Sequence, residues 1–583
     1  MLDRPAFLNV SHSLTGRRWI GPSDALSRHA EALVQETGLP HALAAILARR
    51  QVTAAEADAF LEPTLRDLLP DPRAMRDMEA AATRFLAAMR GRERVAVFAD
   101  YDVDGGASAA LLLTWLREMG CAATLYIPDR IDEGYGPNAP AMAELAREHD
   151  LIICVDCGTL SHEALAAATA ADVIVLDHHL GGETLPPALA VVNPNRQDET
   201  GDLAHLCAAA VVFLMLVEAG RQLREAGEKG PDLMAMLDLV ALATVADVAP
   251  LIGVNRAFVR QGLKVMAARR RIGLTALADI ARLDTEPRSY HLGYVLGPRI
   301  NAGGRIGAAD LGARLLSTAD PHEAAALAER LDALNTERRE VEAAVRDAAL
   351  LQAETRGFDR GLAWAAGDGW HPGVVGIVAS RMKETSGRPS VVIGFEGDAG
   401  KGSARSIPGV DLGASIQRLA VEGLIEKGGG HKMAAGLSLT RAQLEPAMAR
   451  LEELLARQGA AEGAAAELRC DAVLMPGAAT VELIELLERA GPFGAAASAP
   501  RFALADLRVA HAKEVGAGHL KLDLTDGLGG RLSAIAFGAF DGPLGPALAQ
   551  KNAARVHVAG RLEVNSWGGR TSPQFRLEDA ALA

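Results

Sequence analysis

Short apolar runs that end in acidic residues recur through the first half of the chain. The run Arg94–Ala99 is followed by aspartates and glycines and then by Ser108–Met119, which has helical spacing. The same order returns after Leu151–Val155 and after Val173–Leu176. Short buried strands alternating with helices are typical of an open parallel sheet, whose ligands bind beyond the carboxyl ends of the strands. The pattern predicts an α/β domain with its site among these acidic residues.

The rest of the chain shows three further patterns. Ala324–Leu350 is charged and Ala-rich without Gly or Pro, which predicts a long connecting helix. A second, smaller α/β domain follows it, and the last hundred or so residues alternate apolar and polar positions as in a small β-barrel. The predicted domains are an N-terminal extension (1–85), a catalytic domain (86–255), a helical region with the connecting helix (256–350), the smaller α/β domain (351–455) and the barrel (465–583).

Composition narrows the classes of function. The 583 residues carry a formal net charge of −14, so the chain is no general binder of polyanions, and a nucleic-acid site would need a local basic groove. Five cysteines are too few for a disulfide scaffold, and Cys154 and Cys157 are interpreted as a buried strand end rather than a redox or zinc pair. Neither a signal peptide nor a membrane span is evident, so we expect a cytoplasmic protein that contacts no membrane.

Three carboxylates stand at alternate positions in Asp100, Asp102 and Asp104. In an extended segment alternate side chains face the same way, so the three would converge and repel one another. A divalent cation would resolve this repulsion. The alternative is a solvated acidic turn after a strand, which is common in loops rich in Asp and Gly.

Other candidate ligands occupy similar positions. Asp156 and Asp177-His178-His179 follow two further predicted strands, and Asp247 lies where a helical pattern ends. Carboxylates with imidazole suit Mn²⁺ or Mg²⁺, since hard oxygen ligands dominate and no thiolate pattern competes. The set is large enough for two ions that share a bridging aspartate, the usual arrangement for phosphodiester hydrolysis.

These segments resemble the motifs of the DHH phosphoesterase family. The matching stretches occur in the family's order and are Asp100–Gly105, Val155–Gly158, Asp177–His179 and Ala243–Asp247. Over nearly its full length the chain is most similar to the branch that degrades single-stranded DNA from 5′ to 3′ and serves recombination and repair. The resemblance implies a parallel-sheet DHH catalytic domain, a smaller α/β DHH-associated domain joined to it by a long helix, and a C-terminal OB-type β-barrel.

The resemblance also implies roles for individual residues. Asp102, Asp104, Asp156, His178 and Asp247 would hold two Mn²⁺ or Mg²⁺ ions, with Asp156 as the bridge and Asp100 as a further ligand or close neighbour. His179 would face the scissile phosphate as an acid or hydrogen-bond donor, and Asp177 would orient its neighbours.

Single-stranded DNA needs donors for its phosphates and flat surfaces for its bases. The resemblance makes Ser403 and Arg405 candidates for a 5′-terminal phosphate, and Gly430-His431 a second candidate loop. Candidates for the internal backbone are Arg130, Arg299, Asn301 and Arg305, and those for stacking are Tyr135, Tyr294 and Trp370. For any single Arg the alternative is a surface ion pair. Candidate protein partners are a single-stranded-DNA-binding protein and a helicase, and we expect a monomer.

Two other functions remain open at this point. One is a DHH-type phosphodiesterase for short oligoribonucleotides or cyclic dinucleotides, against which the barrel and the chain length argue. The other is an inactive relative that serves as a scaffold, which should have lost metal ligands, whereas every motif position is filled here.

Overall fold

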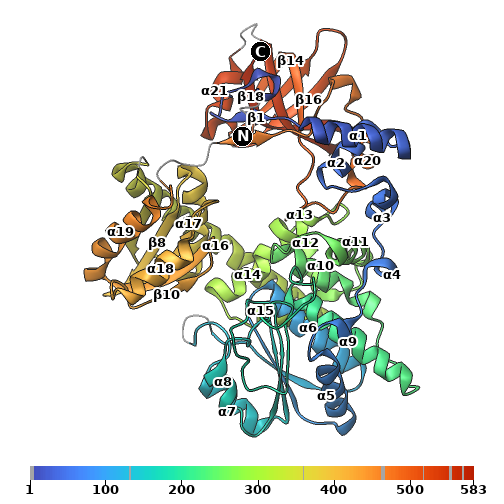
Figure 1. The fold of residues 1–583 in the computed structure, drawn as a ribbon, viewed down its shortest axis with the longest axis vertical. Helices are drawn as coiled ribbons and strands as arrows, with labels where there is room; N and C mark the ends of the chain where they lie inside the picture. Colours follow the sequence, from blue (N-terminus) through green and yellow to red (C-terminus); the bar gives the residue numbers. More distant parts are fainter. Residues whose placement is uncertain are drawn as a thin grey trace. The chain divides into compact units, whose positions relative to one another are not determined.

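The computed structural model describes residues 5–129, 133–358, 360–460, 466–516, 518–550, 555–567 and 570–583. Its elements form two compact units (Figure 1). The first unit contains residues 1–70, 248–261 and 465–583, and the second contains 71–247 and 262–464. Helix α11 (Gly253–Ala267) includes the boundary after Gln261. None of the helices in these described ranges is long and apolar enough to cross a membrane.

The first unit combines a β-barrel with the N-terminal part of the chain. Five strands close on themselves in the order β14-β15-β16-β18-β17, because β17 also pairs with β14. These strands are β14 (Phe502–Val515), β15 (His519–Thr525), β16 (Arg531–Ala536), β17 (Arg555–Trp567) and β18 (Arg570–Leu582). One apolar core joins the barrel to α1 (Asp24–Thr37), α2 (His41–Arg49), α3 (Ala57–Leu61) and α20 (Val481–Glu488). Strand β1 (Arg18–Ile20) pairs in parallel with β12 (Glu467–Arg469).

The second unit is built on a parallel sheet. In the described residues this sheet has five strands in the order β3-β2-β4-β5-β6, and every pairing is parallel. The strands are β2 (Val95–Ala99), β3 (Ala123–Tyr126), β4 (Leu151–Val155), β5 (Asp172–Leu176) and β6 (Ala190–Val192). Strands β2 and β4 are buried at every position, as expected of a sheet covered on both faces.

Helices cover both faces of this sheet. Helices α7 (Ala139–Glu148) and α8 (His162–Ala166) share a core with alternate residues of the strands, among them Phe98, Ile152 and Val175. Helices α5 (Met78–Gly91), α6 (Val103–Glu118) and α9 (Ala208–Glu225) also contact the sheet (Figure 1).

A helical segment connects this sheet to a second one. It comprises α10 (Leu237–Ala246), α12 (Ile272–Ile280), α13 (Ser289–His291), the π-helix η5 (Leu292–Leu296), α14 (Gly297–Ile306), α15 (Leu311–Ser317) and α16 (Pro321–Arg356). Helix α16 is 36 residues long and contains the predicted connecting helix. The second sheet is mixed, in the order β10-β11-β9-β8-β7. Its elements are β7 (Ala363–Asp368), α17 (Pro372–Ser386), β8 (Ser390–Glu396), β9 (Ala399–Arg405), α18 (Leu412–Val421), β10 (Lys427–Gly430), β11 (Ala434–Thr440) and α19 (Arg441–Ala456).

The predicted architecture of a parallel sheet, a long helix, a smaller α/β sheet and a barrel is confirmed. Edge strands β3 and β6 were not predicted, and α6 begins earlier than the predicted Ser108. The exact domain boundaries stay predictions. Helices α1 to α3 of the N-terminal extension share a core with the barrel, whereas residues from Asp71 onward belong to the second unit. Cys154 and Cys157 are both buried free thiols at the end of β4, as their interpretation required.

Candidate metal centre

The acidic residues gather where the order of the parallel strands reverses. From β2 the chain crosses to β3 on one side and then returns to β4 on the other, so the carboxyl ends of β2 and β4 flank a switch point. Open α/β sheets bind ligands in the crevice at such a point. Asp100 directly follows β2, and Asp156 directly follows β4. The topology thus brings these two carboxylates together.

The prediction that Asp100, Asp102 and Asp104 lie on one extended segment is wrong, because α6 begins at Val103. Asp100 and Asp102 come together in one group of possible ligands, and Asp104 belongs to another. Asp102 caps the N-terminus of α6, and its Oδ1 accepts hydrogen bonds from the N–H groups of Asp104 (2.8 Å) and Gly105 (3.1 Å). Asp104 lies in the first helical turn. Gly105 allows the tight turn, because a Cβ there would lie 2.3 Å from the carbonyl oxygen of Asp100.

Asp104 is fixed by the start of a second helix. Its two carboxylate oxygens accept hydrogen bonds from Ala208 N (2.7 Å) and Ala209 N (2.8 Å), the first residues of α9. The first N–H groups of a helix lack partners inside the helix and carry partial positive charge. Helix α9 therefore holds a carboxylate that is only 1% exposed.

Asp156 occupies the middle of the cluster. Its φ of 60° is left-handed, a conformation that Asp adopts more readily than most residues. The carboxylate is buried, and among the described residues none donates a hydrogen bond to Oδ1. A buried carboxylate oxygen that lacks a donor fits a cation as its missing partner.

His178 lies among the carboxylates. Its Nε2 is 3.3 Å from Asp156 Oδ1 and 3.7 Å from Asp104 Oδ2, and its Nδ1 is 3.9 Å from Asp247 Oδ2. Three overlapping sets place their ligand atoms within 4.8 Å of one another: Asp100 with Asp102 and Asp156, Asp104 with His178 and Asp247, and Asp156 with His178 and His179. Every predicted metal ligand belongs to at least one set.

The cluster is electrostatically unfavourable without cations. Burial, and then the charges of Asp104 and its neighbours, hold the pKa of Asp156 well above its usual range. Burial also raises the pKa of Asp104. Burial together with the charges of Asp104 and Asp102 raises the pKa of Asp247 to about 8. Closely spaced carboxylate oxygens with one imidazole are the donor set that Mn²⁺ or Mg²⁺ would fit.

His179 belongs to a separate hydrogen-bonded chain at the edge of the cluster. Its Nδ1 donates to Asp177 Oδ1 (2.8 Å), and its Nε2 lies 3.1 Å from the hydroxyl of Tyr135. Burial would lower the pKa of His179, but the hydrogen bond and charge of Asp177 raise it to about 9. Burial alone would raise the pKa of Asp177, yet the hydrogen bonds from His179 and Thr159 hold it below its usual range. Asp177 thus stays ionised and orients His179.

Most of the candidate internal DNA contacts have partners within the second unit. Arg299 pairs with Asp332 (2.8 Å), which matches the ion-pair alternative. Asn301 Oδ1 accepts a hydrogen bond from Val103 N (3.0 Å), and Arg305 donates to the carbonyl of Gly373 (3.1 Å). Arg130 lies outside the described residues. Contact of these residues with DNA stays a prediction.

The candidate 5′-phosphate residues lie together on the second sheet. Arg405 at the end of β9 donates to Ser403 Oγ (2.8 Å). Both side chains face α17, since a Cβ on Gly376 would lie 3.0 Å from Arg405 Nη2 and 3.1 Å from Ser403 Oγ. Gly430 and His431 are exposed at the β10–β11 hairpin, where β11 pairs with β9. A phosphate-binding role for these four residues stays a prediction.

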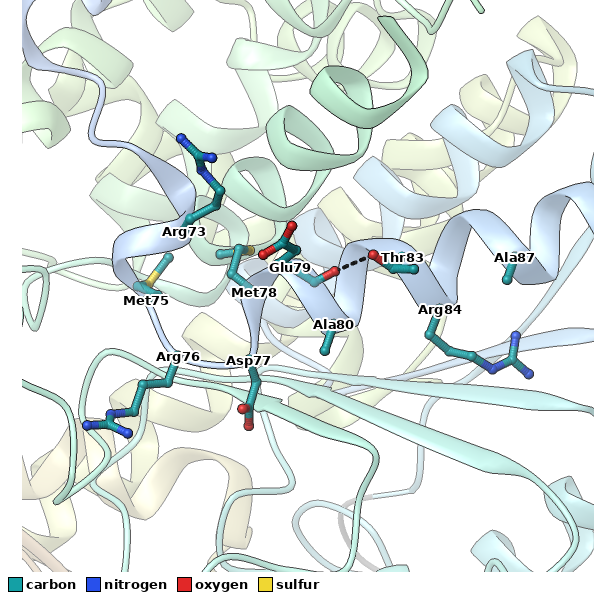
Figure 2. A pocket seen from close by; sticks show the side chains of 10 residues that line it. All are labelled: Arg73, Met75, Arg76, Asp77, Met78, Glu79, Ala80, Thr83, Arg84 and Ala87. Carbon is teal, nitrogen blue, oxygen red and sulfur yellow. Dashed lines mark hydrogen bonds between the residues drawn. The ribbon is translucent and has the colours of Figure 1, made fainter. Parts of the chain in front are cut away.

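A separate pocket of about 800 Å³ lies along α5 (Figure 2). None of its lining residues belongs to the acidic cluster. Its three arginines already have carboxylate partners: Arg73 pairs with Asp71, Arg76 with Asp198, and Arg84 with Asp172 and Glu93. The pocket is therefore separate from the candidate metal centre.

Three family models match the chain in the order of its domains. Residues 94–244 match the DHH family N-terminal domain, 359–457 the DHHA1 domain, and 470–579 the RecJ OB domain. The single-stranded-DNA-specific exonuclease RecJ of Dickeya dadantii is 37% identical over 93% of this chain and 97% of its own length. That of Escherichia coli is 36% identical over 93% and 96%. This chain belongs to the RecJ family.

Solved structures of the RecJ family share the fold. RecJ of Thermus thermophilus in complex with Mn²⁺ superposes with a TM-score of 0.79 at 29% identity, covering 96% of this chain and 79% of that one. The same protein in complex with Mg²⁺ gives a TM-score of 0.73 at 28% identity, covering 97% and 78%.

The sequence patterns missed several residues that support this RecJ-family site. Tyr135 was considered only for stacking, and the amide side chains of Asn193 and Asn195 were not considered. Asn193 follows β6, whose short apolar run gave no strand prediction. Had Ala190–Val192 been predicted as a strand, the polar residues directly after it would have marked both asparagines as candidates for the site.

Proposed function

We propose that this chain is a two-metal exonuclease that degrades single-stranded DNA from the 5′ end and releases 5′-mononucleotides. The observation that carries the proposal is the pair of ligand sets Asp100–Asp102–Asp156 and Asp104–His178–Asp247, which lie next to each other at the switch point. Membership of a family of single-stranded-DNA-specific exonucleases supplies the substrate.

Asp156 and His178 link the two ligand sets. Asp156 also belongs to the set with His178 and His179, so it is the bridging candidate. Two bound cations would polarise the phosphodiester and lower the pKa of a water molecule. The ligands themselves contribute rigidity, because α9 fixes Asp104, and the α6 N-terminus fixes Asp102.

His179 is the proton donor in this proposal. Asp177 holds its Nδ1, so Nε2 is the atom that can reach substrate. The raised pKa keeps the ring protonated near neutral pH in the metal-free protein. A protonated Nε2 can give its proton to the leaving oxygen or a hydrogen bond to the phosphate. The hydroxyl of Tyr135 occupies that position here and would move aside or remain beside the phosphate.

The 5′ end is proposed to bind on the second sheet. Ser403 and Arg405 lie against the first turns of α17, whose N-terminal N–H groups favour anions. Arg305 ties α14 to the start of α17 through the carbonyl of Gly373. A terminal phosphate held there would set the direction of degradation.

An exposed aromatic pair supports the single-strand preference. Tyr290 and Tyr294 stack with ring centroids 5.1 Å apart and are 56% and 68% exposed. The π-helix between α13 and α14 packs on α10, since a Cβ on Gly293 would lie 3.4 Å from Val245 Cγ1, two residues before Asp247. Unpaired bases can stack on such rings whatever their sequence.

The test is product analysis on 5′-phosphorylated single-stranded DNA with Mn²⁺ or Mg²⁺. Wild type should release mononucleotides from the 5′ end and leave a matched duplex intact. Asp156→Ala and EDTA should each abolish release. Cleavage that starts at the 3′ end, or that survives EDTA, would contradict the proposal.

The biological setting is proposed on the same basis. A 5′-to-3′ single-strand exonuclease serves DNA recombination and repair, where single strands are exposed. A single-stranded-DNA-binding protein, a helicase, a monomeric state and a cytoplasmic location stay predictions.

A further inference from the structure

We infer that Asn193 and Asn195 are positioning residues for the two histidines of the metal centre, through hydrogen bonds to the histidine carbonyls. The inference rests on the proposed function, because it concerns residues that hold the same ligands. Neither asparagine belongs to any of the ligand sets described above.

Both side chains hold the main chain that carries the histidines. Asn195 Nδ2 donates to the carbonyl of His178 at 2.6 Å, and Asn193 Nδ2 donates to the carbonyl of His179 at 2.8 Å. The N–H groups of the same two residues donate to Asp177 Oδ1. The backbone of this dipeptide is thereby held through both its carbonyl and its N–H groups.

Asn193 also joins three loops of the switch region. Its Nδ2 donates to Thr159 Oγ1 (2.8 Å) in the loop after β4, and its Oδ1 accepts from Asn195 N (2.7 Å) after β6. Thr159 N in turn donates to Asp177 Oδ2 (3.0 Å). Asn193 is fully buried, and these bonds use both its donor and its acceptor atoms.

His178 needs such support because the ion-pair contacts of its ring nitrogens, among the described residues, are all to carboxylates. A metal-binding histidine usually has one ring nitrogen held by a carboxylate or carbonyl outside the metal site. Here the ion-pair contacts of both ring nitrogens are to Asp104, Asp156 and Asp247, which are themselves proposed ligands. The main chain sets the position from which the His178 side chain extends toward these ligands, and Asn195 holds that main chain.

The experiment compares Mn²⁺ binding by wild type, Asn195→Ala and Gln197→Ala, using calorimetry and the Mn²⁺ electron paramagnetic resonance spectrum. Gln197 is a matched control. Its amide donates to the carbonyl of Gly181 (3.3 Å), two residues after His179 in the same loop, but it contacts neither histidine. Loss of support outside the ligand shell typically weakens metal affinity about 10- to 100-fold. We expect that loss for Asn195→Ala and an unchanged affinity for Gln197→Ala.

Two additional measurements separate positioning from general stability. The thermal midpoint of the EDTA-treated variants should match wild type for Asn195→Ala, whose side chain is only partly buried. In a His178→Ala background, Asn195→Ala should cause no further loss of Mn²⁺ affinity, because the ligand it positions is gone. An additive loss in that background would overturn the inference.

The outcomes also distinguish this inference from the proposed function. Wild-type protein that binds no Mn²⁺ would refute the metal centre itself. Wild type that binds two ions, beside an Asn195→Ala variant of equal affinity or a Gln197→Ala variant equally weakened, would refute only the positioning role.

Discussion

The two α/β sheets of the second unit differ in the residues that end their strands. In the parallel sheet, β2, β4 and β5 each lead into an aspartate, at Asp100, Asp156 and Asp177. In the mixed sheet, β7 and β8 also end at acidic residues, Asp368 and Glu396, but at the opposite edge β9 ends at Arg405 and β10 at Gly430. Concentrated negative charge holds cations, whereas arginine and exposed N–H groups hold phosphates. The contrast suggests that one sheet performs the chemistry and the other holds the DNA end.

The strongest test of this division is Asp156→Asn in the parallel sheet. Asparagine keeps the shape and tolerates the left-handed φ of 60°, but it removes the charge that would bridge the cations. We expect the exonuclease rate to fall by more than about 100-fold, the upper end for residues that only support a ligand.

The same substitution should stabilise the metal-free protein. Burial and neighbouring carboxylates raise the pKa of Asp156, so its ionised form destabilises the fold at neutral pH. Differential scanning calorimetry in EDTA should give a higher thermal midpoint for Asp156→Asn than for wild type. A lower midpoint would mean that Asp156 serves the fold rather than the cations.

His179→Gln should separate proton donation from metal binding within the same sheet. Loss of a positioned acid typically costs about 100- to 10,000-fold in rate. We expect that loss in kcat, with two Mn²⁺ ions still bound by calorimetry. Asp177→Asn should act in the same direction, because it removes the carboxylate that holds His179 Nδ1. A loss of bound Mn²⁺ in His179→Gln would assign this histidine to the metal ligands instead.

Arg405→Ala tests the other sheet. A hydrogen bond to a charged group contributes about 1.5–3 kcal/mol, which is about 10- to 100-fold in affinity. We expect KM for 5′-phosphorylated DNA to rise by that factor, while KM for 5′-hydroxyl DNA and both kcat values change little. Arg418→Ala is the control, since Arg418 is an exposed arginine of the same domain that pairs with Glu422. A fall in kcat with unchanged KM would break the proposed division between the sheets.

The parallel sheet was predictable because its signals are local. Each strand is a short apolar run, and the aspartate that follows it falls at the same edge of the sheet whatever the strand order. The role of Asp102 as a helix cap was not recognised, since alternate spacing is compatible with both a strand and a capped helix. Asn193 and Asn195 act on main-chain carbonyls, and such contacts leave no spacing pattern in the sequence.

Long-range pairings lay outside the reach of the sequence for a different reason. Strand β1 pairs Arg18 with Glu467, and Trp19 Nε1 donates to Asp579 Oδ2 at 2.9 Å. Partners so distant along the chain are selected by the packing of the whole barrel, and the local alternation of polar and apolar residues is the same with or without them. The sequence therefore predicted the barrel but not the N-terminal segment that completes its unit.

The smallest expected effect is a pH dependence confined to the metal-binding sheet. In the metal-free protein the pKa of Asp247 is raised to about 8, first by burial and then by Asp104 and Asp102. A cation must displace this proton, which by itself should increase the affinity for Mn²⁺ about fivefold between pH 7 and pH 8. Calorimetry in buffers of different protonation enthalpy should show the proton released. Asp247→Asn should bind more weakly and show a smaller pH dependence, because the raised pKa of Asp156 remains. A wild-type affinity that is independent of pH over this range would show that Asp247 is already ionised before the cation arrives.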